Sequence, residues 1–199
     1  MKTISVTIEP LSPLLMHRFP DGDNGSSVSV QSGHRPISNG EQGTPRDQAE
    51  GFSYRDGDGN LYIPGPNLNA AIIAAGKFHK HQKNKLTTFT TSLVPAGLLV
   101  TDLAIPLRDR TNGGAQLNHF EVDSRRVVNR VTGGAHICHR PRVDSYKATF
   151  SLQWDDSYFP QSLVRDLVND AGSKIGVGAF RPEKKGPFGR FTVTNWTVE

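Results

Sequence analysis

Regular alternation of apolar and polar residues fixes the order of elements in this chain. From residue 2 to residue 9, isoleucine and valine take every second position and threonine or serine the positions between. That pattern predicts a strand with one buried face. The alternation returns over 146–154 and 191–197, and an apolar stretch broken by proline and glycine covers 93–107. We therefore expect four strands.

Two helices are expected between these strands. Pro66 suits the first turn of a helix, where its missing N–H has no cost, and Leu68 and Ala71 follow at helical spacing. A second helix is expected over 160–171, with Gly172 at its C-terminal cap. The order strand, helix, strand, strand, helix, strand predicts an α+β, ferredoxin-like (RRM-like) fold.

Composition limits the remaining possibilities. Residues 20–51 are rich in Gly, Ser, Asn, Gln and Pro and poor in apolar side chains. They cannot recover their ordering entropy by burial, so we expect a flexible loop within a single domain covering 1–199. One cysteine, Cys138, excludes an intrachain disulfide and a cysteine-based zinc site. Because no apolar run approaches the roughly 20 residues of a membrane span, and 1–18 lacks a signal-peptide layout, we expect a soluble cytoplasmic protein without membrane contact or cofactor.

The positive charge of the chain is concentrated in one segment. The chain has 23 Lys+Arg and 19 Asp+Glu, a net charge of +4. Residues 122–147 hold six basic residues and two acids, so the remaining 17 basic and 17 acidic residues balance. This segment alternates, contains Gly133-Gly134 and alternates again, which predicts a β-hairpin over 122–146 inserted between the two middle strands. Such a basic ribbon favours a polyanionic partner, above all nucleic acid.

A two-residue turn at Gly133-Gly134 would place Arg125 directly across from Arg142. Like charges in that position destabilise a ribbon, but a phosphate between them would make the pair useful. In that register Arg125, Arg140 and Arg142 share one face, and Arg126 and Arg130 share the other.

A second basic segment, over 172–191, precedes the last strand. Its stretch from 174 to 190 carries five basic residues and one acid, Glu183. Its glycines would let the backbone approach a ligand closely, and Phe180 and Phe188 could stack on bases. The segment is neither a Walker A loop nor a Rossmann turn.

Together these features resemble the RAMP superfamily of CRISPR ribonucleoprotein complexes, above all the backbone subunits that polymerise along guide RNA. The resemblance rests on the ferredoxin-like order, on Ile63-Pro64-Gly65 at the first helix and on the glycine-rich loop before the last strand. The segments VDSRRVV and GPFGRF also resemble uncharacterised small proteins of bacteriophages and prophages. The resemblance covers most of the chain except 20–51. It implies a palm, a thumb hairpin formed by 122–146, and identical copies stacked head to tail around single-stranded nucleic acid, with other CRISPR-type subunits as possible partners.

We therefore expect a protein that binds single-stranded RNA or DNA and forms homo-oligomers along it. The expected binding residues are Arg125, Arg126, Arg130, His139, Arg140 and Arg142 of the hairpin, Lys174, Arg181, Lys184, Lys185, Phe188 and Arg190 of the loop, and His17 and Arg18 after the first strand. Two alternatives stay open. One is a metal-independent endoribonuclease of the RAMP type that uses His17. Other RAMP backbone subunits cut target RNA with an aspartate in the loop after the first strand, a region that here contains Asp21 and Asp23. The other is a structural phage protein whose basic ribbon binds an acidic partner.

Overall fold

The computed structural model describes residues 1–18, 43–111, 114–128 and 133–198 and is built on an antiparallel sheet. The strands of this sheet are β1 (Lys2–Pro10), β3 (Tyr62–Pro64), β6 (Leu98–Val100), β7 (Ala104–Arg108), β10 (Lys147–Trp154) and β11 (Phe191–Val198). Their order is β11-β1-β10-β7-β3, and β6 also pairs with β10. Every pair in this sheet is antiparallel. The protein is thus mixed α and β, with β1 and β10 at the centre.

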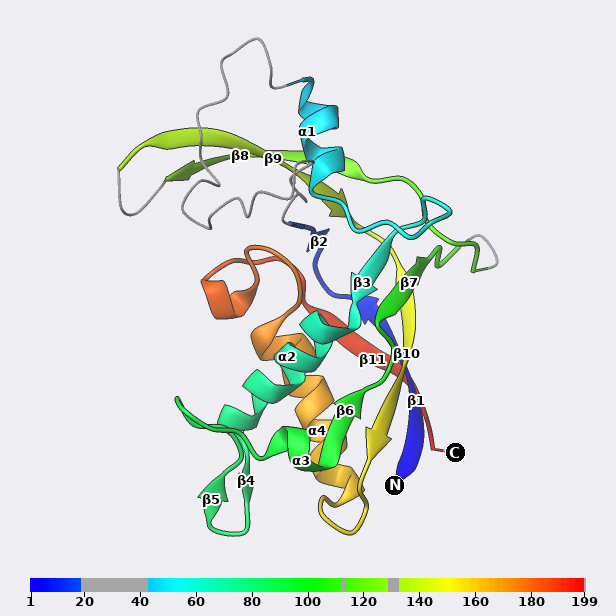
Figure 1. The fold of residues 1–199 in the computed structure, drawn as a ribbon, viewed down its shortest axis with the longest axis vertical. Coiled ribbons are helices and arrows are strands. Elements are labelled where there is room, and N and C mark those ends of the chain that lie inside the picture. The colour runs from blue at the N-terminus through cyan, green and yellow to red at the C-terminus, as the bar shows by residue number, and fades with distance from the viewer. Residues whose placement is uncertain (19–42, 112–113, 129–132, 199) are drawn as a thin grey trace.

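Two helices, α2 (Gly65–Ala75) and α4 (Gln161–Asp170), cover one face of the sheet and pack against each other (Figure 1). Leu68 of α2 and Leu167 of α4 are fully buried in the same hydrophobic core as Ile4 and Phe150 of the sheet. Burying one such side chain contributes about 1.5–3 kcal/mol, which explains why the alternating strands and the periodic helices find each other. A short helix, α3 (Val94–Gly97), precedes β6.

A second, three-stranded sheet forms a ribbon that projects from the first (Figure 1). It consists of β2 (Leu14–Leu15), β8 (Glu121–Val128) and β9 (Ala135–Val143), in the order β2-β9-β8. The helix α1 (Pro45–Gly51) packs against this ribbon. At the opposite end of the long axis, β4 (Lys80–His81) and β5 (Asn84–Lys85) make a small hairpin.

The structure confirms the strands predicted over 2–9, 146–154 and 191–197 and both helices. The prediction of one strand over 93–107 is wrong, because the segment forms α3, β6 and β7 in succession, with Pro95 in the first turn of α3. The predicted helix end at Gly172 is also wrong. A π-helical turn, Ala171–Ile175, continues α4, since Ala171 and Ile175 are fully buried in the core.

The predicted loop over 20–51 is wrong for its last seven residues, which form α1. The Thr44 side chain accepts from the Asp47 backbone N–H at 3.2 Å, and Asp47 accepts from the Thr44 N–H at 2.8 Å. This capping box satisfies donors that the helix end leaves unpaired. Ala49 is the buried side chain of α1, so the helix rests on its cap and on polar contacts. Residues 20–42 lie outside the described part of the chain.

We predict that Gly65→Ala destabilises the fold. Gly65 joins β3 to α2, and a Cβ there would lie 1.7 Å from the Asp102 carbonyl oxygen, which is backbone and cannot swing away. Overpacking of this kind costs about 1–3 kcal/mol or more. Gly57→Ala is the matched control, because no heavy atom lies within 4 Å of its Cβ position. Urea unfolding of both variants checks this, and equal midpoints would contradict it.

Candidate nucleic-acid interface

The ribbon pairs in a different register from the predicted one. Val128 lies opposite Ala135, so residues 129–134 connect the strands in place of a two-residue turn. Arg125 consequently faces Cys138, and Arg142 faces Glu121. The predicted Arg125–Arg142 opposition is therefore wrong. The shift covers an even number of residues, so the faces are unchanged. Arg142 now faces an opposite charge, which stabilises a ribbon.

Acidic neighbours two residues away hold two of these arginines. Arg125 donates to both oxygens of Asp123, at 2.6 and 2.9 Å, and this bonding raises the pKa of Arg125. Arg142 donates to both oxygens of Asp144, at 2.7 and 3.0 Å. Asp123 is only 6% exposed, so Arg125 compensates a buried carboxylate. These arginines have a structural task whether or not they bind a ligand.

Arg125 also joins the ribbon to the glycine-rich loop. Its guanidinium carbon lies 4.6 Å from the centre of the Phe188 ring, in cation–π geometry. Phe188 is only 6% exposed, so its predicted stacking on a base is not supported. Phe180 is 41% exposed, and its ring centre lies 6.2 Å from that of Phe188. Phe180 is the phenylalanine of this loop that can receive a base.

The backbone of residues 11–16, which we call the bridging segment, bonds to both the ribbon and the loop. On the ribbon side, β2 pairs with β9, and the Met16 N–H donates to the Pro141 carbonyl at 3.0 Å. On the loop side, the Ala179 N–H donates to the Leu15 carbonyl at 2.8 Å. The Gly189 N–H donates to the Pro13 carbonyl at 2.8 Å. These bonds set the position of the two basic segments relative to each other.

Gly178 makes the close approach of loop and bridging segment possible. Its φ is +77°, and a Cβ there would lie 2.4 Å from the Leu15 carbonyl oxygen. Any other residue would meet both a strained backbone and a backbone atom. The sequence analysis expected the loop glycines to let the backbone approach a ligand. At Gly178 the backbone instead approaches another segment of the same protein, at Leu15.

The loop cations fall into four groups. Arg181 is half-buried and donates to Glu183 at 2.7 and 3.2 Å and to the Gly178 carbonyl at 3.2 Å. Lys184 and Lys185 are exposed and make no ion pair with any described residue. Lys174 lies in the π-helical turn that continues α4 and pairs with Asp170 of that helix at 2.6 Å. A further exposed cation, Arg190, carries backbone bonds to the bridging segment at Leu11 and Ser12.

His17 is held at the base of the ribbon. Its ring stacks on Phe52 with centroids 4.6 Å apart, and its Nδ1 accepts from Arg140 Nε at 3.2 Å. That nitrogen is therefore occupied and is not free to act as a base in this arrangement. The backbone of the adjacent Arg18 donates to the Phe52 carbonyl at 3.0 Å.

The opposite face of the ribbon presents other candidates. Arg126 is exposed there, opposite Ile137, which is 63% exposed. On the same face, His139 Nδ1 and Ser124 Oγ are hydrogen-bonded at 2.7 Å. The sites predicted at Arg130, Asp21 and Asp23 lie outside the described residues.

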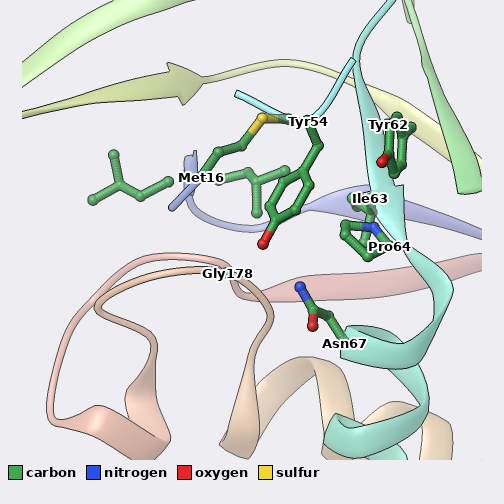
Figure 2. A pocket seen from close by; sticks show the side chains of 9 residues that line it. Met16, Tyr54, Tyr62, Ile63, Pro64, Asn67 and Gly178 are labelled. Carbon is green, nitrogen blue, oxygen red and sulfur yellow. The ribbon is translucent and has the colours of Figure 1, made fainter. Parts of the chain in front are cut away.

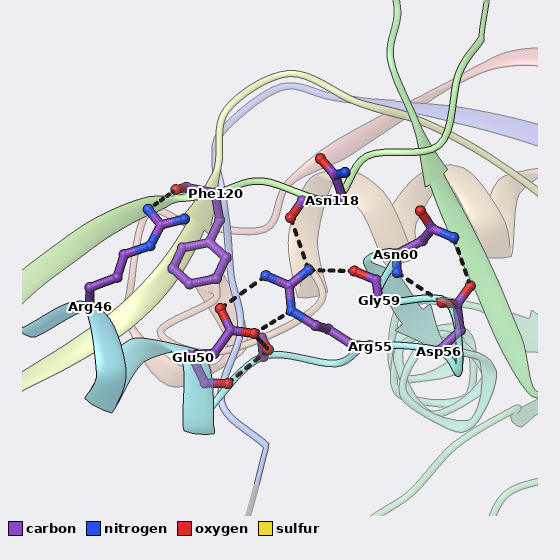
Figure 3. A network of polar contacts seen from close by, with 9 residues as sticks. Arg46, Glu50, Arg55, Asp56, Gly59, Asn60, Asn118 and Phe120 are labelled. Carbon is purple, nitrogen blue, oxygen red and sulfur yellow. Dashed lines mark hydrogen bonds and ion pairs between the residues drawn. The ribbon is translucent and has the colours of Figure 1, made fainter. Parts of the chain in front are cut away.

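Two arginines that the sequence analysis did not single out anchor the ribbon to α1 (Figure 3). Arg46 of α1 donates to the Phe120 carbonyl at 2.9 Å, and its guanidinium lies 4.4 Å from the Phe120 ring centre. Arg55 forms an ion pair with Glu50 and donates to the Asn118 carbonyl at 2.9 Å. This bonding to Arg55 lowers the pKa of Glu50. Because Phe120 directly precedes β8, these contacts fix the entry to the ribbon.

A shallow pocket opens beside the bridging segment and contains no charged side chain (Figure 2). Leu14, Leu15 and Met16 form one wall, and residues 62–64, Tyr54, Asn67 and Gly178 complete it. The Tyr54 hydroxyl donates to the His17 carbonyl at 3.4 Å. The lining contains no carboxylate, imidazole or amine, so the hydroxyls of Tyr54 and Tyr62 are its acid–base groups, and that of Tyr54 is bonded to a backbone carbonyl.

The open face of the main sheet is polar. Its central strands present Thr3, Ser5 and Thr7 from β1 and Thr149, Ser151 and Gln153 from β10. RRM sheets stack bases on aromatic side chains at such positions, and these two strands offer none there. On this face the central strands of the sheet therefore lack the aromatic side chains that would bind a base, whereas the loop has the exposed ring of Phe180.

Two further observations concern the described residues alone. They contain no group of three or more His, Cys, Asp and Glu side chains that could hold a metal ion. None of their helices is long and apolar enough to cross a membrane. The one cysteine, Cys138, is buried, and this burial raises the pKa of its thiol, so it is a poor nucleophile.

Comparisons with known proteins show a distant structural likeness. No protein-family model matches the chain, and no curated protein sequence matches it. The chain is similar in structure to a chain of the cryo-EM structure of the Type III-B Cmr-beta bound to cognate target RNA, with 11% identity and a TM-score of 0.46. The match covers 99% of this chain and 60% of that one, so this chain spans less than two thirds of its neighbour. A likeness at this level does not assign a function.

We predict that Arg125→Ala destabilises the protein, whereas Arg126→Ala does not. The first change leaves the Asp123 carboxylate buried without its partner and uncovers Phe188, and an unsatisfied buried group costs about 1–3 kcal/mol or more when charged. The second removes an exposed side chain, for which about 0.5 kcal/mol or less is usual. Chemical unfolding measures both, and equal stability of the two variants would contradict the structural role of Arg125.

Proposed function

We propose that this protein binds single-stranded nucleic acid at the ribbon and the glycine-rich loop. The observation that carries the proposal is the contact between Arg125 and Phe188, which brings two basic segments far apart in sequence onto one end of the molecule. Lys184 and Lys185 are exposed, make no ion pair with any described residue and lie in the same loop as the exposed ring of Phe180. Arg126 is a further exposed cation, on the other face of the ribbon. Cations that track phosphates and a ring that receives bases are the two parts of a single-strand site.

We further propose that the main sheet is the ferredoxin-like palm of a RAMP-like protein. Four neighbouring strands of this sheet have the order β11-β1-β10-β7. This is the order of a split βαβ fold, in which the last strand lies beside the first. The helices α2 and α4 occupy the two crossover positions, and the ribbon follows β7 in the chain. These features support the palm and thumb that the sequence resemblance implies.

In this proposal copies of the protein assemble head to tail along RNA or single-stranded DNA, as in CRISPR complexes. Such contacts do not close on themselves, so assembly follows the length of the bound strand. The ribbon face with Arg126, Ile137 and Val128 supports this part, because 63% of Ile137 and 49% of Val128 are exposed. Apolar side chains on a projecting ribbon are suited to a neighbouring copy.

We predict that Lys184→Ala/Lys185→Ala weakens binding to mixed-sequence single strands. Each lost phosphate contact lowers the slope of log affinity against log salt by roughly 0.7. The loss is expected to be similar across sequences, since phosphate contacts carry no base information. Lys2→Ala/Arg165→Ala is the charge-matched control, because both residues lie outside the ribbon and the loop. A salt titration of the three proteins measures the slopes.

Equal slopes for both double variants would refute phosphate binding by the loop.

Incubation with labelled RNA, without divalent ions, tests the alternative that the protein is an enzyme. Cleavage that His17→Ala abolishes would replace the binding proposal with an endoribonuclease. Retention on an acidic protein but not on RNA would favour the structural phage protein. Sedimentation on strands of increasing length tests assembly, for which growing particles are expected and a closed dimer would count against it.

A further inference from the structure

The small hairpin β4–β5 carries the like-charge pair that the sequence analysis expected in the large ribbon. Lys80 lies directly opposite Lys85, and His81 lies opposite Asn84. Lys83 stands in the turn, next to Gln82 with its left-handed φ of +56°. Two-stranded hairpins are marginal in water, and opposed like charges weaken them further. Stability of the free protein does not explain this arrangement.

The charge around the hairpin is uncompensated. Residues 77–85 contain four lysines, two histidines and no acid. Within the described part of the chain, Lys80, Lys83 and Lys85 make no ion pair. The neighbouring carboxylate, Asp170, is already shared, since it lies 2.9 Å from His79 Nε2 and 2.6 Å from Lys174 Nζ.

An exposed aromatic ring stands in the middle of this charge. Phe78 is 47% exposed, with Lys77 Nζ 5.1 Å and Lys174 Nζ 4.8 Å from its ring centre. The second contact explains why Lys174 does not belong with the other loop cations. A ring framed by ammonium groups can take a base on its face while the lysines hold the adjoining phosphates.

The hairpin is also fixed in place. His81 packs edge-on against Phe159, with centroids 5.3 Å apart, and against Tyr158 at 5.6 Å. The Leu86 N–H donates to the His79 carbonyl at 3.1 Å, and Leu86 is buried. The lysines are thus presented by an anchored hairpin at the end of the molecule opposite the ribbon (Figure 1).

We infer that the β4–β5 hairpin and Phe78 form a second binding site, separate from the ribbon, for the phosphate backbone of single-stranded nucleic acid. Lys80, Lys83 and Lys85 neutralise phosphates, and Phe78 stacks on a base. Bound phosphate relieves the repulsion between Lys80 and Lys85. The site goes beyond the proposed function, because it does not need the ribbon to bind.

Phe78→Trp turns this site into its own reporter. The two native tryptophans are less exposed, Trp154 buried and Trp196 half-buried, so the parent protein supplies the background signal. Saturable quenching of the introduced indole by a mixed-sequence single-stranded oligonucleotide is expected. Adding Lys80→Gln/Lys85→Gln should lower the slope of log affinity against log salt by about 1.4, since two phosphate contacts are lost. The ratio of the affinity without these two changes to the affinity with them should therefore fall about sevenfold between about 50 and about 200 mM salt. The melting temperature should not fall, because the removed pair is repulsive.

A charge-matched variant separates this site from the proposed function. Lys184→Gln/Lys185→Gln removes the same charge at the other end and should leave quenching of the introduced indole intact, even if it abolishes binding at the loop. Absence of quenching, or equal quenching after Lys80→Gln/Lys85→Gln, would overturn the inference. Displacement of the oligonucleotide by polyglutamate at equal charge concentration would also overturn it, because the site would then recognise acidic chains in place of nucleic acid.

Discussion

The bridging segment, residues 11–16, is the constraint on which the rest of the structure depends. Its backbone leaves the main sheet at β1, pairs with β9 on one side and accepts the Ala179 and Gly189 N–H groups on the other. Each of these bonds requires a backbone within about 3 Å, which is why Gly178 stands beside Leu15. A change in this segment would therefore move the ribbon and the loop relative to each other and to the sheet.

The basic residues of the protein have two different roles. Arg125, Arg142 and Arg181 each bond to a nearby acid, and Arg140 bonds to His17. These arginines hold parts of the protein together, whereas the exposed lysines of the loop and of the small hairpin are the residues that we propose bind phosphates. Net charge alone does not separate the two roles, because both kinds of residue add equally to the total of +4. Their partners separate them.

Local pattern was sufficient for much of the fold. Alternation identified β1 and β10, each of which buries one face, as well as β11, and Pro66 marked the first turn of α2. It missed α1, which buries Ala49 and is otherwise held by its cap and by Arg46 on Phe120. It also missed the ribbon register. That register depends on contacts between segments, namely the pairing of β9 with β2 and the position of Arg140 opposite Asp123, which local alternation does not contain. The burial of Phe188 under Arg125 is likewise a contact across the chain that no local spacing encodes.

Hydrogen exchange with and without a mixed-sequence single strand tests the central claim most directly, that ribbon and loop act as one surface. The account predicts that bound nucleic acid slows exchange in β8, in β9 and over 181–186 together, at the same strand concentration, because the bridging segment holds these parts as one unit. Protection should disappear in high salt. Protection of the ribbon without the loop, of the loop without the ribbon, or of neither would contradict the account.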